Sequence, residues 1–230
     1  MFLIDAFNWT QLLQPQFYID NGGLWLVLFI IFAETGLFAG FFLPGDSLLF
    51  VAGIFSSQLA ASFYDTQSDF LNLLLIIALT SVAGILGNTV GYWFGRKIGP
   101  SMFTWRDRFL FKQRYLYQAR DFYDKHGGGA IVFARFLPVV RTFAPIVAGI
   151  VNMDRKKFGF YNIIGCIAWT TSMLGAGHYL QRFFLDKFNY DLKEHLEVIV
   201  LGIVLVTTAP VIFKMFFSKR KDPSPPPNPS

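Results

Sequence analysis

Four ionisable residues lie inside two stretches of sequence that are otherwise apolar. Glu34 and Asp46 interrupt the stretch 24–55, and Arg135 and Arg141 interrupt the stretch 130–151. A charge at the centre of a membrane helix costs about 2.5–3.5 kcal/mol on insertion scales. Four unpaired charges would therefore cost on the order of 10 kcal/mol, comparable to the whole stability of a domain. We expect these side chains to pair with one another or to face water.

The residue types at these positions suggest two kinds of chemistry. A carboxylate in a poorly hydrated site can take up and release a proton near neutral pH, and Glu34 and Asp46 are candidates for that role. Two arginines that face one cavity, as Arg135 and Arg141 would, can bind a phosphate group in bidentate fashion. The alternative is structural: two salt bridges that lock the two stretches together. Asp46, in the sequence Pro44-Gly45-Asp46, also suits the N-cap of a following helix.

The composition predicts a membrane protein. Of 230 residues, 53% are hydrophobic, 18% aromatic and only 15% charged, whereas soluble domains carry about 25% charged residues. This composition argues against disorder, fibrous repeats and nucleic-acid binding as the main function. The one cysteine, Cys166, cannot form an internal disulfide, and no Cys/His pattern has zinc-site spacing. We therefore expect neither a metal nor a cofactor.

The basic residues are distributed very unevenly along the chain. Residues 1–95 contain no Lys or Arg and six acids, so all 20 basic residues lie from Arg96 onward. Because cytoplasmic segments of membrane proteins are enriched in Lys and Arg, we expect 1–23 and 55–70 outside the cell, and 96–125, 155–157 and 219–221 inside. The chain is then a multi-pass membrane protein with a cytoplasmic C-terminus.

This charge pattern also predicts the helical elements. A crossing helix needs about 20 predominantly apolar residues, but 24–55 and 130–151 contain helix-breaking Gly and Pro, and each begins and ends on one side of the membrane. We therefore predict a single membrane domain over 1–217. Its expected elements are a re-entrant hairpin over 24–55, a span over 71–94, an interfacial helix over 106–125, a second re-entrant hairpin over 130–151, and spans over 158–180 and 196–216. A disordered cytoplasmic tail is expected over 218–230.

A short internal repeat links the two hairpins. Residues 42–44 and 136–138 both read FLP, and residues 51–54 and 147–150 both read VAGI. A hairpin followed by a spanning helix, repeated in the opposite orientation, is the inverted-repeat plan of secondary transporters. The predicted fold is thus an all-α polytopic membrane protein with an inverted repeat of re-entrant hairpin plus helix, and an additional C-terminal transmembrane helix. Gly87, Gly91, Gly95 and Gly99 predict a stripe of close helix packing.

Several longer strings resemble the DedA family of bacterial inner-membrane proteins, which is related to the eukaryotic VTT-domain lipid scramblases. The strings are ETG (34–36), FLPGDSLLFVAG (42–53), GYWFGRKIG (91–99), FYDKHGG (122–128) and ARFLPVVRTFAPIVAG (134–149), and the likeness covers about residues 20–217. The resemblance implies movement of lipids, notably undecaprenyl phosphate, across the bilayer, dependent in some members on the proton gradient. It also implies that the functional acidic pair is Glu34 and Asp46, and the functional arginine pair Arg135 and Arg141.

We therefore expect a lipid-phosphate translocase in which the arginines hold the phosphate and the carboxylates take protons. Its partners would be a membrane lipid (a polyprenyl phosphate or phospholipid) and protons; the oligomeric state, including a homo-oligomer, stays open. The main alternative is a proton-dependent antiporter of small solutes or cations. An assembly scaffold is a weaker alternative, and so is an intramembrane phosphatase. The phosphatase would need a nucleophile, yet Ser47 and Thr142 are the only nearby hydroxyls and no phosphatase motif surrounds them. We do not expect an enzyme.

Overall fold

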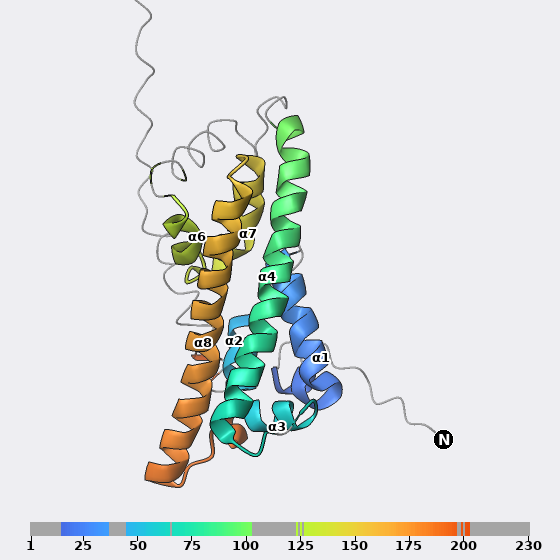
Figure 1. Cartoon of the computed structure of the whole chain (residues 1–230). Coiled ribbons are helices and arrows are strands. Elements are labelled where there is room, and N and C mark those ends of the chain that lie inside the picture. The colour runs from blue at the N-terminus through green and yellow to red at the C-terminus, as the bar shows by residue number, and fades with distance from the viewer. Residues whose placement is uncertain are drawn as a thin grey trace, which may run out of the picture.

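Two long antiparallel helices, α4 (Asp69–Met102) and α8 (Arg155–Phe188), form the frame of the molecule (Figure 1). The computed structural model describes residues 15–36, 45–64, 66–102, 123, 125, 127–196, 199 and 201–202. Every regular element in these ranges is helical, in agreement with the predicted all-α class. The remaining elements are α1 (Pro15–Gly36), α2 (Gly45–Ile54), α3 (Ser56–Ala61), α6 (Gly129–Ala134), α7 (Pro138–Ile150) and a 3-10 helix, η3 (Leu192–His195).

The ends of the two long helices follow local sequence signals. Asp69 lies in the first turn of α4, where a negative charge is favourable because of the helix dipole. Asp154 caps α8 by accepting a hydrogen bond from the Lys157 backbone amide at 2.9 Å, and Asn189, the residue that follows the last residue of α8, adopts the left-handed conformation. The predicted spans 71–94 and 158–180 both fall within these helices, and each helix is longer than predicted, at 34 residues.

The shorter helices form two groups along the long pair (Figure 1). The predicted stretch 24–55 contains the end of α1 and all of α2, and the predicted stretch 130–151 contains most of α6 and all of α7. α1 packs mainly on α4 and α2 on α8, whereas α6 packs on α8 and α7 on α4. Within each group, the two helices thus contact different long helices. The order is reversed between the groups: α4 then α8 in the first group, and α8 then α4 in the second.

Glycines bring the backbones of these helices into direct contact. In the α2–α8 contact, a Cβ on Gly53 would overlap the carbonyl of Leu174, and one on Gly177 the carbonyl of Phe50. In the α7–α4 contact, likewise, a Cβ on Gly149 would overlap the Tyr92 carbonyl, and a Cβ on Gly95 would overlap the Ile146 carbonyl. The predicted stripe on α4 lies here: Gly95 and Gly99 face α7, Gly87 faces the end of α1, and Gly91 lies between the two.

The helix lengths bear on how the chain could sit in a bilayer. Among the described residues, the stretch Asp69–Gly99 of α4 is the one helix that is both long and apolar enough to cross a membrane. α8 is equally long, but its composition is more polar. α2 and α7 have 10 and 13 residues, which at 1.5 Å per residue gives about 15 and 20 Å, less than the hydrocarbon core of about 30 Å. The predicted interfacial helix 106–125, the predicted span 196–216 and the tail lie almost entirely outside the described residues.

Large apolar side chains cover both the inside and the outside of the described part. A core of α1, α2, α4 and α8 residues surrounds Trp169 and Leu174. The outer faces of α4 and α8 carry many exposed large apolar residues, among them Val82, Leu86 and Val90 on α4 and Ile163 and Ile167 on α8. Exposed apolar faces of this kind mark surfaces that meet a protein partner or lipid.

Candidate functional site

The centre of the candidate site is Arg141, in the first turn of α7. Its Nη2 donates to Glu34 Oε1 at 2.5 Å, and its Nη1 donates to Asp46 Oδ1. The exposed fractions of Arg141, Glu34 and Asp46 are 7%, 2% and 8%, so both ion pairs are shielded from water. The structure therefore brings together three of the four charges that the sequence singled out, one from each of α1, α2 and α7.

Trp169, on α8, completes the wall of this cluster. Its Nε1 donates to Asp46 Oδ1 at 3.0 Å, and its ring faces the Arg141 guanidinium at 4.7 Å. This cation–π contact and hydrogen bond hold the ion pairs against α8. Sequence reasoning missed Trp169, because a tryptophan in an apolar span carries no signal that distinguishes a site residue from a core residue.

Gly45 makes room for the Glu34 carboxylate. A Cβ on Gly45 would overlap that carboxylate, so only glycine allows Glu34 to sit against the first residue of α2. Among the described residues, Glu34 Oε2 and Arg141 Nε have no hydrogen-bond partner although both are buried. Unpaired buried polar atoms are costly, and they leave this cluster with bonding capacity that a proton or a ligand could use.

Arg135 lies in a different environment from Arg141. It follows α6, is 3% exposed, and donates to Asn162 Oδ1 at 2.5 Å and to Cys166 Sγ at 3.3 Å. Within the described part of the chain no carboxylate forms an ion pair with it. Its direct partners there are neutral, so the buried Arg135 charge is not cancelled by a contacting anion.

Polar side chains between α4 and α8 continue from Arg135. Asn162 also accepts from Asn88 Nδ2 at 3.0 Å and donates to the Ile85 carbonyl at 3.2 Å, and Ser81 is hydrogen-bonded to Thr170 at 2.7 Å. The sequence offered a signal for these contacts between α4 and α8, because asparagines in otherwise apolar spans commonly form hydrogen bonds across helices.

Two smaller sequence predictions can be compared with the geometry. Asp46 lies inside the first turn of α2 rather than at its N-cap, and its Oδ1 accepts bonds from Arg141 and Trp169. Ser47 and Thr142, the hydroxyls considered as nucleophiles, are both buried.

No group of three or more His, Cys, Asp or Glu residues suited to a metal occurs in the ranges that the structure describes.

A second polar cluster lies at the far end of the long helices. Asp69 Oδ2 contacts His178 Nε2 at 3.2 Å and Arg182 Nη1 at 3.0 Å, and its Oδ1 accepts from Ser57 at 2.5 Å. His178 Nδ1 is 2.9 Å from Ser56 Oγ. This cluster joins α3, α4 and α8, and its residues are separate from the Arg141 cluster.

Comparison with known proteins identifies the family of this chain. The VTT domain matches residues 43–179, which include Asp46, Arg135 and Arg141. Protein DedA of Escherichia coli K12 is 37% identical over 201 residues, covering 86% of this chain and 85% of DedA. Inner membrane protein YqjA of the same strain is 32% identical, covering 92% of this chain and 98% of YqjA. An uncharacterized membrane protein of Mycobacterium leprae is 33% identical, covering 90% of this chain and 89% of that protein.

No solved structure matches the chain. The chain belongs to the VTT-domain family and, within it, is a DedA-family protein close to DedA.

Proposed function

We propose that this protein is a bacterial inner-membrane transporter that moves an anionic, phosphate-bearing lipid across the bilayer, coupled to protons. Undecaprenyl phosphate or a related lipid is the substrate that we favour. The carrying observation is the buried Arg141 cluster, in which one guanidinium is shared by Glu34 and Asp46. Relatives of similar length are named as membrane and inner-membrane proteins, which supports the location.

In this proposal, the two carboxylates and the phosphate compete for Arg141. Two carboxylates occupy the guanidinium in the observed state. When both take a proton they lose their charge, and the guanidinium becomes available to phosphate oxygens, which match its fork of donors. Glu34 Oε2, which has no partner among the described residues, would take one of these protons. Release of phosphate would return the carboxylates to Arg141 and free the protons on the other side.

Arg135 would make the first contact with the phosphate. Its described partners, Asn162 and Cys166, are neutral, so a phosphate can bind it without displacing a carboxylate. Electrostatic attraction to a buried cation with no contacting anion is strong because little water screens it. The two arginines thus have different roles: Arg135 attracts the head group, and Arg141 links its binding to protonation.

The helix arrangement supports a site reached from both sides. α2 and α7 are both too short to cross the bilayer, and both begin near the Arg141 cluster. Helix starts carry partial positive charge that favours an anionic group. The matched glycine contacts of α2 with α8 and of α7 with α4 are what an inverted repeat of re-entrant hairpins would produce. We therefore keep the re-entrant, inverted-repeat topology as part of the proposal.

Head-group translocation in proteoliposomes tests this function. A fluorescent polyprenyl phosphate and a fluorescent phospholipid are compared, with and without a pH gradient, for the parent protein, Arg135→Gln, Arg141→Gln and Glu34→Gln. Arg182→Gln is the control, because it removes an exposed arginine at the far end. We expect both inner arginine variants to lose polyprenyl phosphate movement, and Glu34→Gln to lose the response to the gradient.

The same vesicles test the alternative. Unchanged lipid movement in Arg141→Gln would refute the proposed role of the cluster. Cation–proton exchange that is lost in Glu34→Gln while lipid movement persists would instead favour the antiporter.

A further inference from the structure

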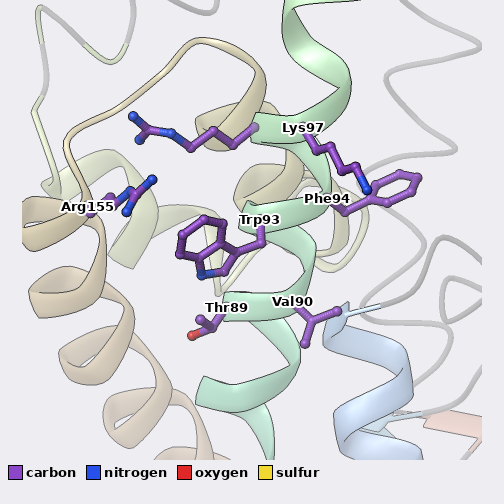
Figure 2. Close-up of a pocket in the computed structure, with 7 residues that line it drawn as sticks. Thr89, Val90, Trp93, Phe94, Lys97 and Arg155 are labelled. Atoms are coloured by element: carbon purple, nitrogen blue, oxygen red, sulfur yellow. The ribbon is translucent and has the colours of Figure 1, made fainter.

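An open groove of about 640 Å³ lies between α4 and the start of α8 (Figure 2). Its lining includes Thr89, Val90, Trp93, Arg96, Lys97 and Arg155. None of these residues contributes to the Arg141 cluster, and the groove faces outward. A volume of this size falls within the range of small-ligand sites.

One wall of the groove is aromatic and carries a cation. Trp93 projects from α4 toward α8 and is 49% exposed, and the Arg155 guanidinium lies over its ring at 4.4 Å (Figure 2). This cation–π contact fixes the position of Arg155. Trp93 thereby offers an apolar face and an ordered positive charge at the same place, a combination typical of the membrane–water interface.

The second cation, Arg96, is held in place by hydrogen bonds. Its Nη1 donates to the Tyr92 hydroxyl at 2.7 Å, and that hydroxyl donates to the Met153 carbonyl at 2.5 Å. The Tyr92 ring stacks on Phe158 with 4.3 Å between centroids. Arg96 is therefore ordered before any ligand binds.

The charge around the groove is positive. Lys97 adds a third, exposed cation, and no carboxylate in the described ranges forms an ion pair with any of the three. The adjacent acid, Asp154, is engaged in capping α8 through the Lys157 amide. The groove is thus complementary to an anion rather than to a neutral head group.

An apolar stripe leads away from these cations along α4. Val82, Leu86 and Val90 follow at four-residue spacing before Trp93, so they lie on one face of the helix, and all are at least two-fifths exposed. A soluble anion has no apolar part that could contact this stripe. An acyl chain would cover it while its head group stays at the cations.

We propose that this groove binds an anionic phospholipid from the leaflet at this end of the helices. The phosphate lies among Arg96, Lys97 and Arg155, and one acyl chain follows Trp93 and Val90. The inference depends on the proposed membrane location but not on lipid translocation, because no residue of the groove is in the transport cluster. Basic pockets between membrane helices are known to hold anionic head groups.

Quenching of tryptophan fluorescence tests the site. The full chain is reconstituted with brominated-chain phosphatidylglycerol or brominated-chain phosphatidylcholine, and the ratio of the two quenching constants gives the preference for the anionic lipid. We expect a preference of several-fold in the parent protein. Trp93→Phe should remove the component of quenching that is selective for phosphatidylglycerol.

A matched pair of variants separates a site from general surface charge. Lys97→Gln with Arg155→Gln removes two lining cations, and Lys156→Gln with Lys187→Gln removes two exposed cations that do not line the groove. We expect the first pair to lose most of the several-fold preference, because each cation near an anionic surface contributes to the attraction, and the second pair to keep it almost unchanged. Equal losses in both pairs, or no preference in the parent protein, would overturn the inference.

Further readouts keep this result distinct from the transport proposal. Thermal unfolding in detergent verifies that each variant is folded before quenching is measured. Arg141→Gln should leave the preference for phosphatidylglycerol unchanged. A preference lost in Arg141→Gln but kept in the lining pair would refute the groove as the binding site.

Discussion

Replacing Arg141 by glutamine should destabilise the protein strongly, because it unbalances the buried charges. Among the described residues, Arg141 is the cation that pairs with both buried carboxylates, whereas the contacts of Arg135 are to neutral Asn162 and Cys166. Arg141→Gln leaves Glu34 and Asp46, 2% and 8% exposed, without the cation that they share. Removing one partner of a buried ion pair costs about 3–5 kcal/mol. Trp169 would still donate to Asp46, so we expect about 4 kcal/mol.

A second change should recover part of that loss. Adding Glu34→Gln and Asp46→Asn to Arg141→Gln removes the two uncompensated charges and leaves neutral amides that can bond with one another. We expect the triple variant to be more stable than Arg141→Gln by about 2 kcal/mol, since each uncompensated charge costs that much or more in a membrane helix. The three changes would then be strongly non-additive, as expected for residues in one network.

Thermal unfolding in detergent measures both effects. For a chain of 150–250 residues, 1 kcal/mol shifts Tm by about 2–4 °C, so Arg141→Gln should lower Tm by about 8–16 °C. Arg182→Gln, which breaks an exposed ion pair with Asp69, should cost less than about 1 kcal/mol. An Arg141→Gln protein as stable as its parent, or a triple variant less stable than Arg141→Gln, would refute the charge-balance reasoning.

Three further predictions concern single positions. Gly45→Ala displaces the Glu34 carboxylate and should slow lipid translocation about tenfold or more in the vesicle assay, whereas Gly175→Ala, whose Cβ meets nothing within 4 Å, should leave it unchanged. Gly149→Ala forces a methyl group onto the rigid Tyr92 carbonyl and should cost about 1–3 kcal/mol, read from Tm against the same control. Asp154→Ala should speed hydrogen exchange in the first turn of α8, and Asp154→Asn should not. The Lys157 amide holds the pKa of Asp154 below its usual range. The stabilisation of α8 by Asp154 is therefore complete above about pH 4 and is lost only as the pH falls through that lowered pKa. Helical content measured in acid would show this loss.

The expected pairing of the buried charges is observed for Glu34, Asp46 and Arg141, because a charge in an apolar stretch is costly enough to require a partner. Arg135 departs from the expectation, since it is buried and its described partners are neutral. The sequence could not predict which charge pairs with which. Arg141, in the first turn of α7, binds both carboxylates, while Arg135, which follows α6, donates to Asn162 and Cys166. Trp169 was missed because only tertiary packing distinguishes it from the surrounding core residues.

Helix existence was also easier to predict than helix extent. The apolar runs within α4 and α8 identified both helices, but each continues for more than a turn beyond its run at one end or both. Capping and packing decide where these helices end, and hydropathy alone does not report either. The groove was not predicted at all, since Trp93 and Arg155 are 62 positions apart and meet only because α4 and α8 are antiparallel.

The two arginines have unequal surroundings, and this difference predicts the order in which a phosphate and protons would bind. An anion that met only Arg141 would have to displace two carboxylates at once, and that exchange would cost two buried ion pairs before any new one formed. In the proposed mechanism Arg135 would remove this difficulty, because its described partners are neutral and it would bind the phosphate first. The bound phosphate would then bring negative charge toward the two carboxylates, and nearby negative charge favours the protonated form of a carboxyl group. Binding of the lipid and uptake of protons would therefore promote one another, and this mutual effect is the physical basis of coupling.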